Sequence, residues 1–397
     1  MNRKLISAPI LILLVILISC TSSKDSLQEP TTIQIQYLDP TLPVTLTIPA
    51  TATPIPQQGT MDPDAYPLAV QGSYWPGNRS YTLVDPSRSD REIQITIYYP
   101  ALKEFNSDNN PITQDAAPDL SGAPYPIILT GPNSGSLLFQ SHLASHGFVM
   151  VIVRPPGFSY EDPWDLIVID GPLDFLFALD QLTASPPDGL ANLMDTDRVG
   201  VAGYSWDGFF SLALAGVRID PENYLSQCAL APSLDPPLSP RMFDYYCSLA
   251  AKWDQFASYA GEIIPSSDDG LWQPLTDERI LAVMPMAPDG AWLYGERGLS
   301  EVHIPTLIIT GTYDYFSSYT METSYIHEHL GSSDRYLISF IGKNHMMVFN
   351  SGVRLRMKHF ASAFFGYYLQ GREDYVEYFL EDFVSQFDDL AWGVYGK

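Results

Sequence analysis

Residues 199–210 read VGVAGYSWDGFF, and this stretch decides the fold. Val199–Ala202 is a short apolar run of the kind that forms a buried strand, and Phe209–Val217 has the pattern of a helix. A serine between a strand and a helix sits on a sharp turn, so the hydroxyl of Ser205 is predicted to project from the carboxyl edge of a sheet. The helix N-terminus behind Ser205 favours negative charge. Gly203 is required because the strand and helix backbones approach closely there.

The same alternation of strands and helices continues along most of the chain. Continuous apolar runs bounded by turn residues indicate strands that are buried on both faces, which is typical of a parallel sheet covered by helices. Residues 91–99 instead alternate with period two, which predicts a half-exposed strand near a sheet edge. The other predicted strands are 126–129, 148–153, 199–202, 280–286, 306–310 and 336–341, and the predicted helices are 137–146, 173–182, 209–217, 319–330 and 353–369. We therefore expect an α/β architecture with right-handed crossovers.

One long connection interrupts this alternation. About sixty residues separate the helix that ends near Val217 from the strand that begins at Ile280, and within them residues 242–260 have the pattern of a helix with aromatic side chains on or near one face. A long connection in a compact domain is usually functional, such as a lid. A surface insertion that only covers the sheet predicts the same aromatic burial, so both interpretations of this insert (about residues 220–276) stay open.

Ser205 needs a positioned base before it can act as a nucleophile at neutral pH. Among the seven histidines, His345 is the one that both follows a predicted strand and stands late in the chain. Asp314 follows the predicted strand 306–310, so it is expected at the same edge of the sheet, although a turn aspartate is the simpler interpretation. The sequence thus predicts that Ser205, Asp314 and His345 meet at one edge of the sheet.

Residues 203–208 (GYSWDG) resemble the nucleophile elbow G-x-S-x-G of the α/β-hydrolases, except that Asp207 replaces the second glycine. The chain order Ser205, Asp314, His345 also matches the order of the catalytic triad in that superfamily. Three further segments resemble its dienelactone-hydrolase-like and platelet-activating-factor-acetylhydrolase-like branch: residues 85–91 (DPSRSDR), 143–147 (LASHG) and 195–200 (DTDRVG). The resemblance covers roughly residues 68–369. It implies the α/β-hydrolase fold, with a mostly parallel eight-stranded sheet covered by helices and a helical, lid-like insert before the sixth strand.

The resemblance also implies a carboxylic ester hydrolase that works without a metal ion or an organic cofactor. In this interpretation Ser205 attacks the carbonyl carbon, His345 takes its proton and later protonates the leaving group, and Asp314 orients the imidazole. A serine peptidase of the same fold and a catalytically silent surface binding protein are the alternatives. Few basic residues and an apolar lid favour neutral or apolar acyl and aryl esters as small-molecule substrates.

An ester hydrolase also needs two donors for the oxyanion of the tetrahedral intermediate. The backbone N–H of Trp206 is the first candidate, because the residue after the nucleophile faces that position. The second donor is expected from the loop that follows the strand 126–129. Since Pro132 has no N–H, the sequence points to Asn133.

The N-terminus predicts a targeting signal. Arg3 and Lys4 precede the apolar run 5–18, whose roughly 21 Å as a helix is too short for a bilayer core of about 30 Å. The run ends in LISC, residues 17–20, which resembles the lipobox of bacterial lipoproteins. That resemblance implies export and a lipid on Cys20 that anchors the protein to the outer face of a bacterial membrane, with an ordinary cleaved signal as the alternative. Residues 1–20 are therefore the predicted signal peptide.

The composition of the chain after the signal peptide indicates its domain organisation. Residues 21–64 are rich in Thr, Pro, Ser and Gln and predict a semi-extended spacer, which leaves residues 65–397 as the catalytic domain. The 46 acidic and 21 basic side chains give a net charge of −25, which argues against nucleic acid or an anionic membrane surface as a partner. Cys228 and Cys247 are expected to form a disulfide in an exported chain, with two buried free thiols as the alternative.

Overall fold

The computed structural model describes residues 65–103, 112–134, 139–156, 164–234, 237–261 and 263–397. The predicted signal peptide, the predicted lipidation site Cys20 and the spacer 21–64 lie outside these residues. The described residues all belong to one compact unit that spans residues 55–397. Within the described part, none of the helices is both long and apolar enough to cross a bilayer.

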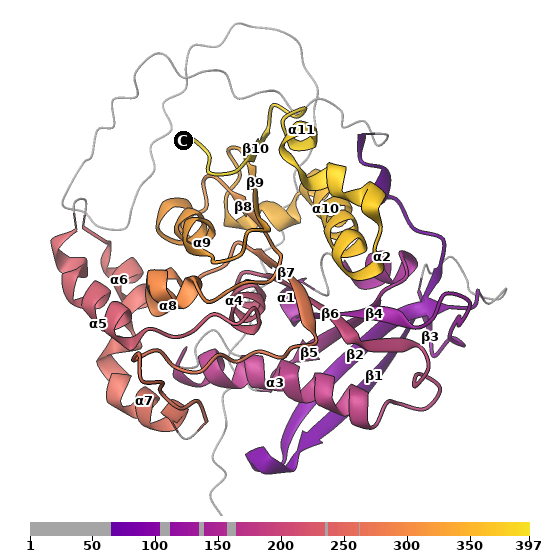
Figure 1. Ribbon diagram of the computed structural model, residues 1–397, viewed down its shortest axis with the longest axis horizontal. Helices are drawn as coiled ribbons and strands as arrows, with labels where there is room; N and C mark the ends of the chain where they lie inside the picture. Colours follow the sequence, from indigo (N-terminus) through magenta and orange to yellow (C-terminus); the bar gives the residue numbers. More distant parts are fainter. Residues whose placement is uncertain (1–64, 104–111, 135–138, 157–163, 235–236, 262) are drawn as a thin grey trace, which may run out of the picture. The chain divides into compact units, whose positions relative to one another are not determined.

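A mostly parallel sheet forms the centre of this unit (Figure 1). Its strands are β1 (Trp75–Asp85), β2 (Arg91–Ala101), β3 (Thr113–Gln114), β4 (Tyr125–Thr130), β5 (Val149–Arg154), β6 (Met194–Tyr204), β7 (Ile280–Met286), β8 (Thr306–Gly311), β9 (Arg335–Phe340) and β10 (Leu390–Trp392). They are ordered β10-β9-β8-β7-β6-β4-β5-β2-β1-β3 across the sheet. The strands β4 to β9 pair in parallel, whereas β1 pairs with β2, β2 with β5, and β10 with β9 in antiparallel fashion. The predicted α/β class is confirmed.

The sheet contains ten strands among the described residues, where eight were expected. The two edge strands account for the difference: β3 has two residues and β10 has three, too few to leave a periodic pattern in the sequence. The strand β1 was not located either, because most of its residues are half-buried or exposed and form no apolar run. The insert consequently precedes β7, the seventh strand in chain order.

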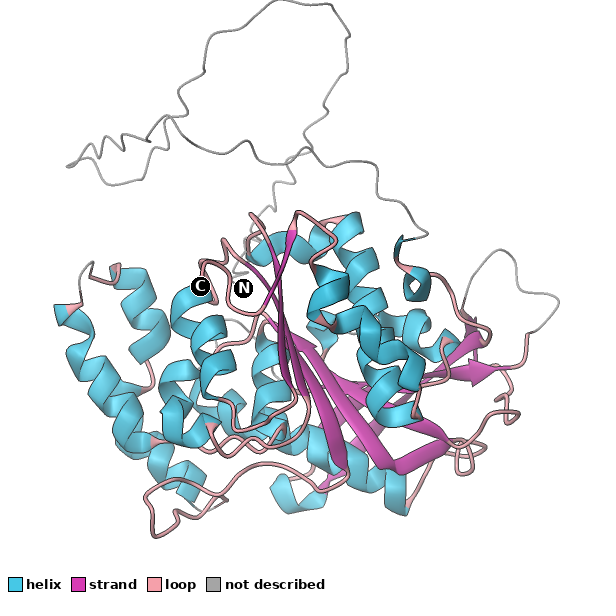
Figure 2. Ribbon diagram, turned by 45° about the horizontal axis from the view of Figure 1, so that its top comes forward, coloured by secondary structure: helices cyan, strands magenta, loops and turns pink. Residues whose placement is uncertain are grey.

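Helices cover both faces of the sheet (Figure 2). The helices are α1 (Pro132–Ser134), α2 (Gln140–Ser145), α3 (Trp164–Ala184), α4 (Trp206–Leu214), α5 (Pro221–Leu230), α6 (Pro240–Cys247), α7 (Trp253–Gly261), α8 (Ala291–Leu299), α9 (Ser324–His329), α10 (Ser351–Gln370) and α11 (Glu381–Val384). Side chains of α3, α4 and α8 share one buried cluster, and those of α2 and α10 share another. Ile127 and Leu129 of β4 point into the first cluster and Ile128 into the second, so both faces of the strand are buried as predicted.

The insert 220–276 contains the helices α5, α6 and α7. The single helix predicted over residues 242–260 is wrong, because a 3-10 turn at Ala250–Lys252 separates α6 from α7. The predicted burial of its aromatic side chains is confirmed, since Tyr246 and Phe256 are buried and Phe243 and Trp253 are partly buried against the same cluster. Cys228 of α5 and Cys247 of α6 are joined in a disulfide, with their Cα atoms 5.5 Å apart. This bond ties α6 to its neighbour within the insert.

Candidate active site

The turn between β6 and α4 places Ser205 in an unusual backbone conformation, with φ 60° and ψ −120°. Few non-glycine residues adopt such angles, and they persist only where the surrounding structure enforces them. Here the N–H of Ser205 donates to the carbonyl of Met286 at 2.9 Å, and its carbonyl accepts from the N–H of Phe209 at 3.0 Å. A Cβ atom at Gly203 would lie 1.8 Å from the carbonyl oxygen of Asp207, so only glycine fits there. Hydrogen bonds to the neighbouring strand β7 and to helix α4 therefore hold the turn in this conformation.

The three residues that the sequence predicted at one sheet edge lie in hydrogen-bond contact. Nε2 of His345 is 2.9 Å from Oγ of Ser205, and Nδ1 of His345 is 2.8 Å from Oδ2 of Asp314. The three residues follow β6, β8 and β9, parallel strands whose carboxyl ends meet at the same edge. The Asp314 side chain is fully buried, whereas that of His345 is 12% exposed. The imidazole can therefore receive a proton from Ser205 on one side and be oriented by a buried carboxylate on the other.

The carboxylate of Asp314 is fixed by its own turn. Its second oxygen, Oδ1, accepts hydrogen bonds from the backbone N–H groups of Phe316 and Ser317, each at 3.0 Å. Because Oδ1 is bound to two amides, Oδ2 points at Nδ1 of His345 and holds the proton on that nitrogen. The other ring nitrogen, Nε2, is then an acceptor for the hydroxyl of Ser205.

Tyr204 is a site residue that sequence reasoning missed. Its hydroxyl donates a hydrogen bond to the backbone carbonyl of His345, and its ring lies 5.4 Å from the imidazole. Burial raises the pKa of the Tyr204 hydroxyl, so the group stays protonated and remains a donor at neutral pH. Tyr204 thereby anchors the histidine loop to the last residue of β6. Its position directly before Ser205 was the signal available in the sequence.

Asp207, the departure from the elbow pattern, is a buried structural link. Its Oδ2 accepts hydrogen bonds from the backbone N–H and the hydroxyl of Ser134, at 2.8 and 2.9 Å. The same Ser134 hydroxyl accepts a hydrogen bond from the N–H of Tyr204 at 2.6 Å. A Cβ atom at Gly131 would lie 2.1 Å from Oδ1 of Asp207. Asp207 stands where the elbow pattern has its second glycine, and its side chain occupies space that only a glycine at position 131, in the loop after β4, leaves open.

The backbone N–H groups of Trp206 and Asn133 are the two predicted oxyanion donors. Trp206 is the first residue of α4, so its N–H is one of the helix N-terminal groups that lie next to Ser205. The backbone N–H of Asn133 lies near enough to the carboxyl of Asp207 to lower its pKa. Both assignments stay predictions.

Exposed apolar side chains adjoin Asp314 and His345 in the chain. Tyr313 and Tyr315, on either side of Asp314, are 66% and 57% exposed, and Met346 and Phe349, after His345, are 50% and 59% exposed. We call these four residues the apolar rim. Large exposed apolar patches are typical of ligand-binding surfaces. The rim therefore offers an apolar approach to the nucleophile.

The insert reaches this site through helix α6. The guanidinium of Arg241 on α6 lies 5.6 Å from the ring centroid of Phe316, and that ring lies 5.3 Å from the imidazole of His345. The insert is thus adjacent to His345, and the lid and cover interpretations both stay open.

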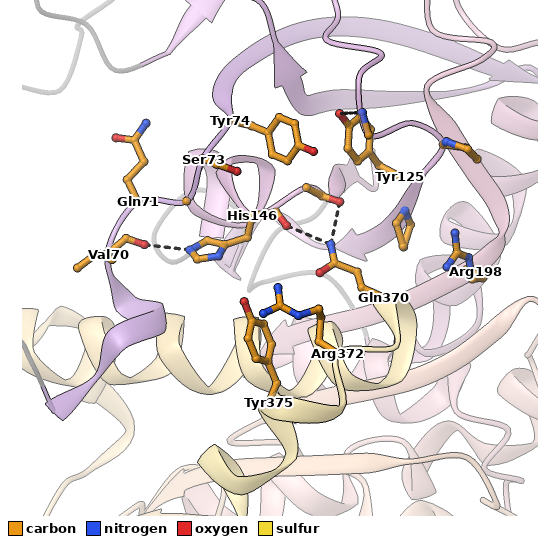
Figure 3. Close-up of a pocket in the computed structure, with 15 residues that line it drawn as sticks. Val70, Gln71, Ser73, Tyr74, Tyr125, His146, Arg198, Gln370, Arg372 and Tyr375 are labelled. Atoms are coloured by element: carbon orange, nitrogen blue, oxygen red, sulfur yellow. Dashed lines mark hydrogen bonds between the residues drawn. The ribbon is translucent and has the colours of Figure 1, made fainter.

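A separate cavity of about 730 Å³ lies at the opposite edge of the sheet (Figure 3). Its wall includes His146, whose Nε2 is bonded to the carbonyl of Val70 rather than to a nucleophile. The amide of Gln370 donates to the carbonyls of His146 and Gly147, each at 3.0 Å. The two arginines of the wall, Arg198 and Arg372, form ion pairs with aspartates close by in the chain. This cavity holds no arrangement like the one at Ser205.

No group of three or more histidine, cysteine or carboxylate side chains among the described residues could hold a metal ion. Comparison with known proteins gives no matching family model and no matching curated protein.

The buried Asp207 predicts a specific pH dependence of stability. Burial raises its pKa from 3.8 to about 7, against the opposing effect of its hydrogen bonds. Between these values the folded protein holds a proton that the unfolded chain releases, so stability falls as pH rises. Asn at position 207 does not titrate. The free energy of unfolding of wild type relative to Asp207→Asn should therefore drop by up to roughly 4 kcal/mol from pH 4 to pH 7.

Urea denaturation at several pH values measures this difference. Asp374→Asn is the control, because Asp374 is exposed and Arg372 lowers its pKa, the opposite direction to the shift at Asp207. A difference between wild type and Asp207→Asn that stays constant from pH 4 to 7 would contradict the prediction.

Proposed function

We propose that this protein is a serine hydrolase with the α/β-hydrolase fold, and that it cleaves carboxylic esters. The observation that carries the proposal is the hydrogen-bonded chain Ser205–His345–Asp314 at the carboxyl edge of a mostly parallel sheet. The strained serine turn between β6 and α4 supports it, because such a turn exposes a nucleophile above the sheet. The resemblance to the dienelactone-hydrolase-like and platelet-activating-factor-acetylhydrolase-like branch belongs to the same proposal.

In the first half of the reaction, Oγ of Ser205 attacks the carbonyl carbon of the ester while Nε2 of His345 takes the hydroxyl proton. The carbonyl oxygen becomes an oxyanion, which the N–H of Trp206 and the N-terminus of α4 stabilise. The intermediate then collapses as the imidazolium protonates the leaving alkoxide. Alcohol departs, and the acyl group stays on Ser205 as an ester.

In the second half, water attacks this acyl-enzyme ester. His345 takes a proton from the water, and the resulting tetrahedral intermediate expels Oγ of Ser205, which recovers its proton from the imidazolium. The products are a carboxylic acid and the free enzyme. Asp314 stabilises the imidazolium in both halves because its buried carboxylate contacts Nδ1. None of these steps calls for a metal ion or an organic cofactor.

The apolar rim supports neutral or apolar esters as substrates. A chain with a net charge of −25 also repels anionic molecules at long range. Export and anchoring through a lipid on Cys20 are part of the proposal and rest on the sequence. Such an anchor needs no basic surface to keep the protein at a membrane.

A panel of p-nitrophenyl esters tests this proposal. We expect turnover of neutral acyl esters, with kcat/KM at least tenfold higher than for half-esters of dicarboxylic acids of the same length, a difference of about 1.4 kcal/mol in transition-state binding. A p-nitroanilide with the same acyl group as the best ester distinguishes a peptidase, which would hydrolyse both. Rapid turnover of the anionic esters with none of the neutral ones would overturn the substrate class. Absence of turnover and of fluorophosphonate labelling would favour a silent binding protein.

A further inference from the structure

The segment Met286–Gly290, which begins at the last residue of β7, lies between the nucleophile turn and the turn that carries Asp314. The carbonyl of Met286 accepts the hydrogen bond from the N–H of Ser205 at 2.9 Å. The carbonyl of Ala287 accepts from the hydroxyl of Ser317 at 2.9 Å. We call residues 286–290 the linking segment. The turn of Ser205 and the turn of Asp314 are therefore both hydrogen-bonded to this one short segment.

Ser317 connects the linking segment directly to the turn that carries Asp314. Its side chain bonds to the linking segment, and its backbone N–H is one of the two donors that fix Oδ1 of Asp314, at 3.0 Å. A displacement of the linking segment would therefore move the catalytic carboxylate. The backbone of Ala287 has a φ of 44°, a strained conformation that must be held by its surroundings.

Asp289 is the residue through which the insert is hydrogen-bonded to the linking segment. Its side chain is buried, and Oδ2 accepts a hydrogen bond from the hydroxyl of Tyr245 at 2.7 Å. The other oxygen, Oδ1, has no hydrogen-bond partner within the described structure, and Tyr245 lowers the pKa of Asp289 more than Ser317 or His345 does. Tyr245 belongs to α6, the helix that the disulfide at Cys247 ties to α5.

Several titratable groups face Asp289. Tyr245 and Tyr246 come from α6, Glu322 from the turn Tyr319–Thr323, and Asp314 and His345 from the catalytic loops. Burial raises the pKa of Asp289 to about 6, with Asp314 raising it further and Tyr245, Ser317 and His345 lowering it. Burial and the charge of Asp289 raise the pKa of Glu322 well above its usual value. The carboxylate of Asp289 and the imidazole of His345 interact electrostatically.

We propose that Asp289 is a positioning residue for the catalytic triad, and that its hydrogen bond to Tyr245 makes helix α6 of the insert part of the framework that holds Ser205 and Asp314 in register. This inference rests on the proposed hydrolase function. It gives the insert a role that neither a mobile lid nor a passive cover has, because α6 must stay in place during the chemical step. Reactions of this kind lose about a hundredfold in rate when reacting groups are displaced by 1 Å.

The test compares two tyrosines of the insert that each donate to a buried or half-buried aspartate. Tyr245→Phe removes the bond to Asp289, and Tyr259→Phe removes the 2.8 Å bond from α7 to Asp170 on α3, away from the triad. With a neutral p-nitrophenyl ester, we expect Tyr245→Phe to lower kcat by roughly 10- to 100-fold with little change in KM. Tyr259→Phe should keep the wild-type kcat. Equal kcat and KM for the two variants would overturn the inference.

Asp289→Asn provides a second measurement that a purely structural role would not move. The asparagine oxygen can still accept from Tyr245, but the negative charge beside His345 is gone. The protonated imidazole is then less stabilised, so we expect the acidic limb of the pH profile of kcat/KM to move to lower pH by roughly 0.5 to 1 unit. A profile that superimposes on that of wild type would count against Asp289. If wild type itself neither turns over esters nor reacts with a fluorophosphonate, the proposed function fails, which is a separate outcome.

Discussion

Ser205→Ala should abolish ester hydrolysis, with kcat lowered by a factor on the order of 10⁴ to 10⁶. The alanine has no oxygen to form the acyl ester, so the only remaining catalysis comes from oxyanion stabilisation and substrate binding. The fold should persist, since the described side-chain bond of Ser205 is the one to His345 and the backbone bonds of the turn are unaffected. The measurement is kcat on the best p-nitrophenyl ester, together with labelling by a fluorophosphonate probe.

Ser385→Ala is the matched control, because Ser385 is exposed and remote in sequence from the catalytic loops. We expect wild type and Ser385→Ala to be labelled and active, and Ser205→Ala to be unlabelled while its circular dichroism spectrum stays native. Labelling that persists in Ser205→Ala would show that another nucleophile reacts with the probe. That result would remove Ser205 from the mechanism.

Asp314→Asn should lower kcat by about 10⁴ while leaving the site in place. Oδ1 of the asparagine can still accept from the N–H groups of Phe316 and Ser317, which directs its NH₂ group at Nδ1 of His345. An NH₂ group there donates rather than accepts, so the imidazole proton moves to Nε2. The histidine then presents a proton to Ser205 and cannot take one from it.

Steady-state kinetics and the fluorophosphonate reaction rate both report this loss. Asp374→Asn removes an exposed carboxylate that pairs with Arg372 and should leave kcat unchanged. A loss smaller than about tenfold in Asp314→Asn would mean that a different carboxylate orients His345. Asp289 would be the first candidate, since it faces the same imidazole.

The sequence was sufficient for the parts of this protein that depend on local patterns. Buried parallel strands leave continuous apolar runs, and β4, β5 and β7 were located from those runs alone. The positions of Ser205, Asp314 and His345 relative to strand ends followed for the same reason, since the carboxyl ends of parallel strands share one edge. The structure adds the geometry of their side chains, with His345 2.8 Å from Asp314 and 2.9 Å from Ser205.

What the sequence did not reveal depends on contacts between distant segments. Asp289 follows a strand as Asp314 does, but its role depends on Tyr245, which lies in a helix about forty residues earlier in the chain, so no local pattern indicated it. The effect of the Asn133 N–H on the pKa of Asp207 could not be predicted, because the two residues belong to different loops. The break between α6 and α7 was missed because the aromatic spacing runs through it.

The pairing of Asp207 with Gly131 has a consequence for how this site can vary. The carboxylate occupies the space that a side chain at position 131 would need, and it binds the loop that Gly131 begins. Glycine at position 207 would therefore leave the Ser134 donors unmatched, and any larger residue at position 131 would collide with Asp207. Position 131 can accept a side chain only after position 207 has lost its carboxylate, so the order of the two changes is fixed.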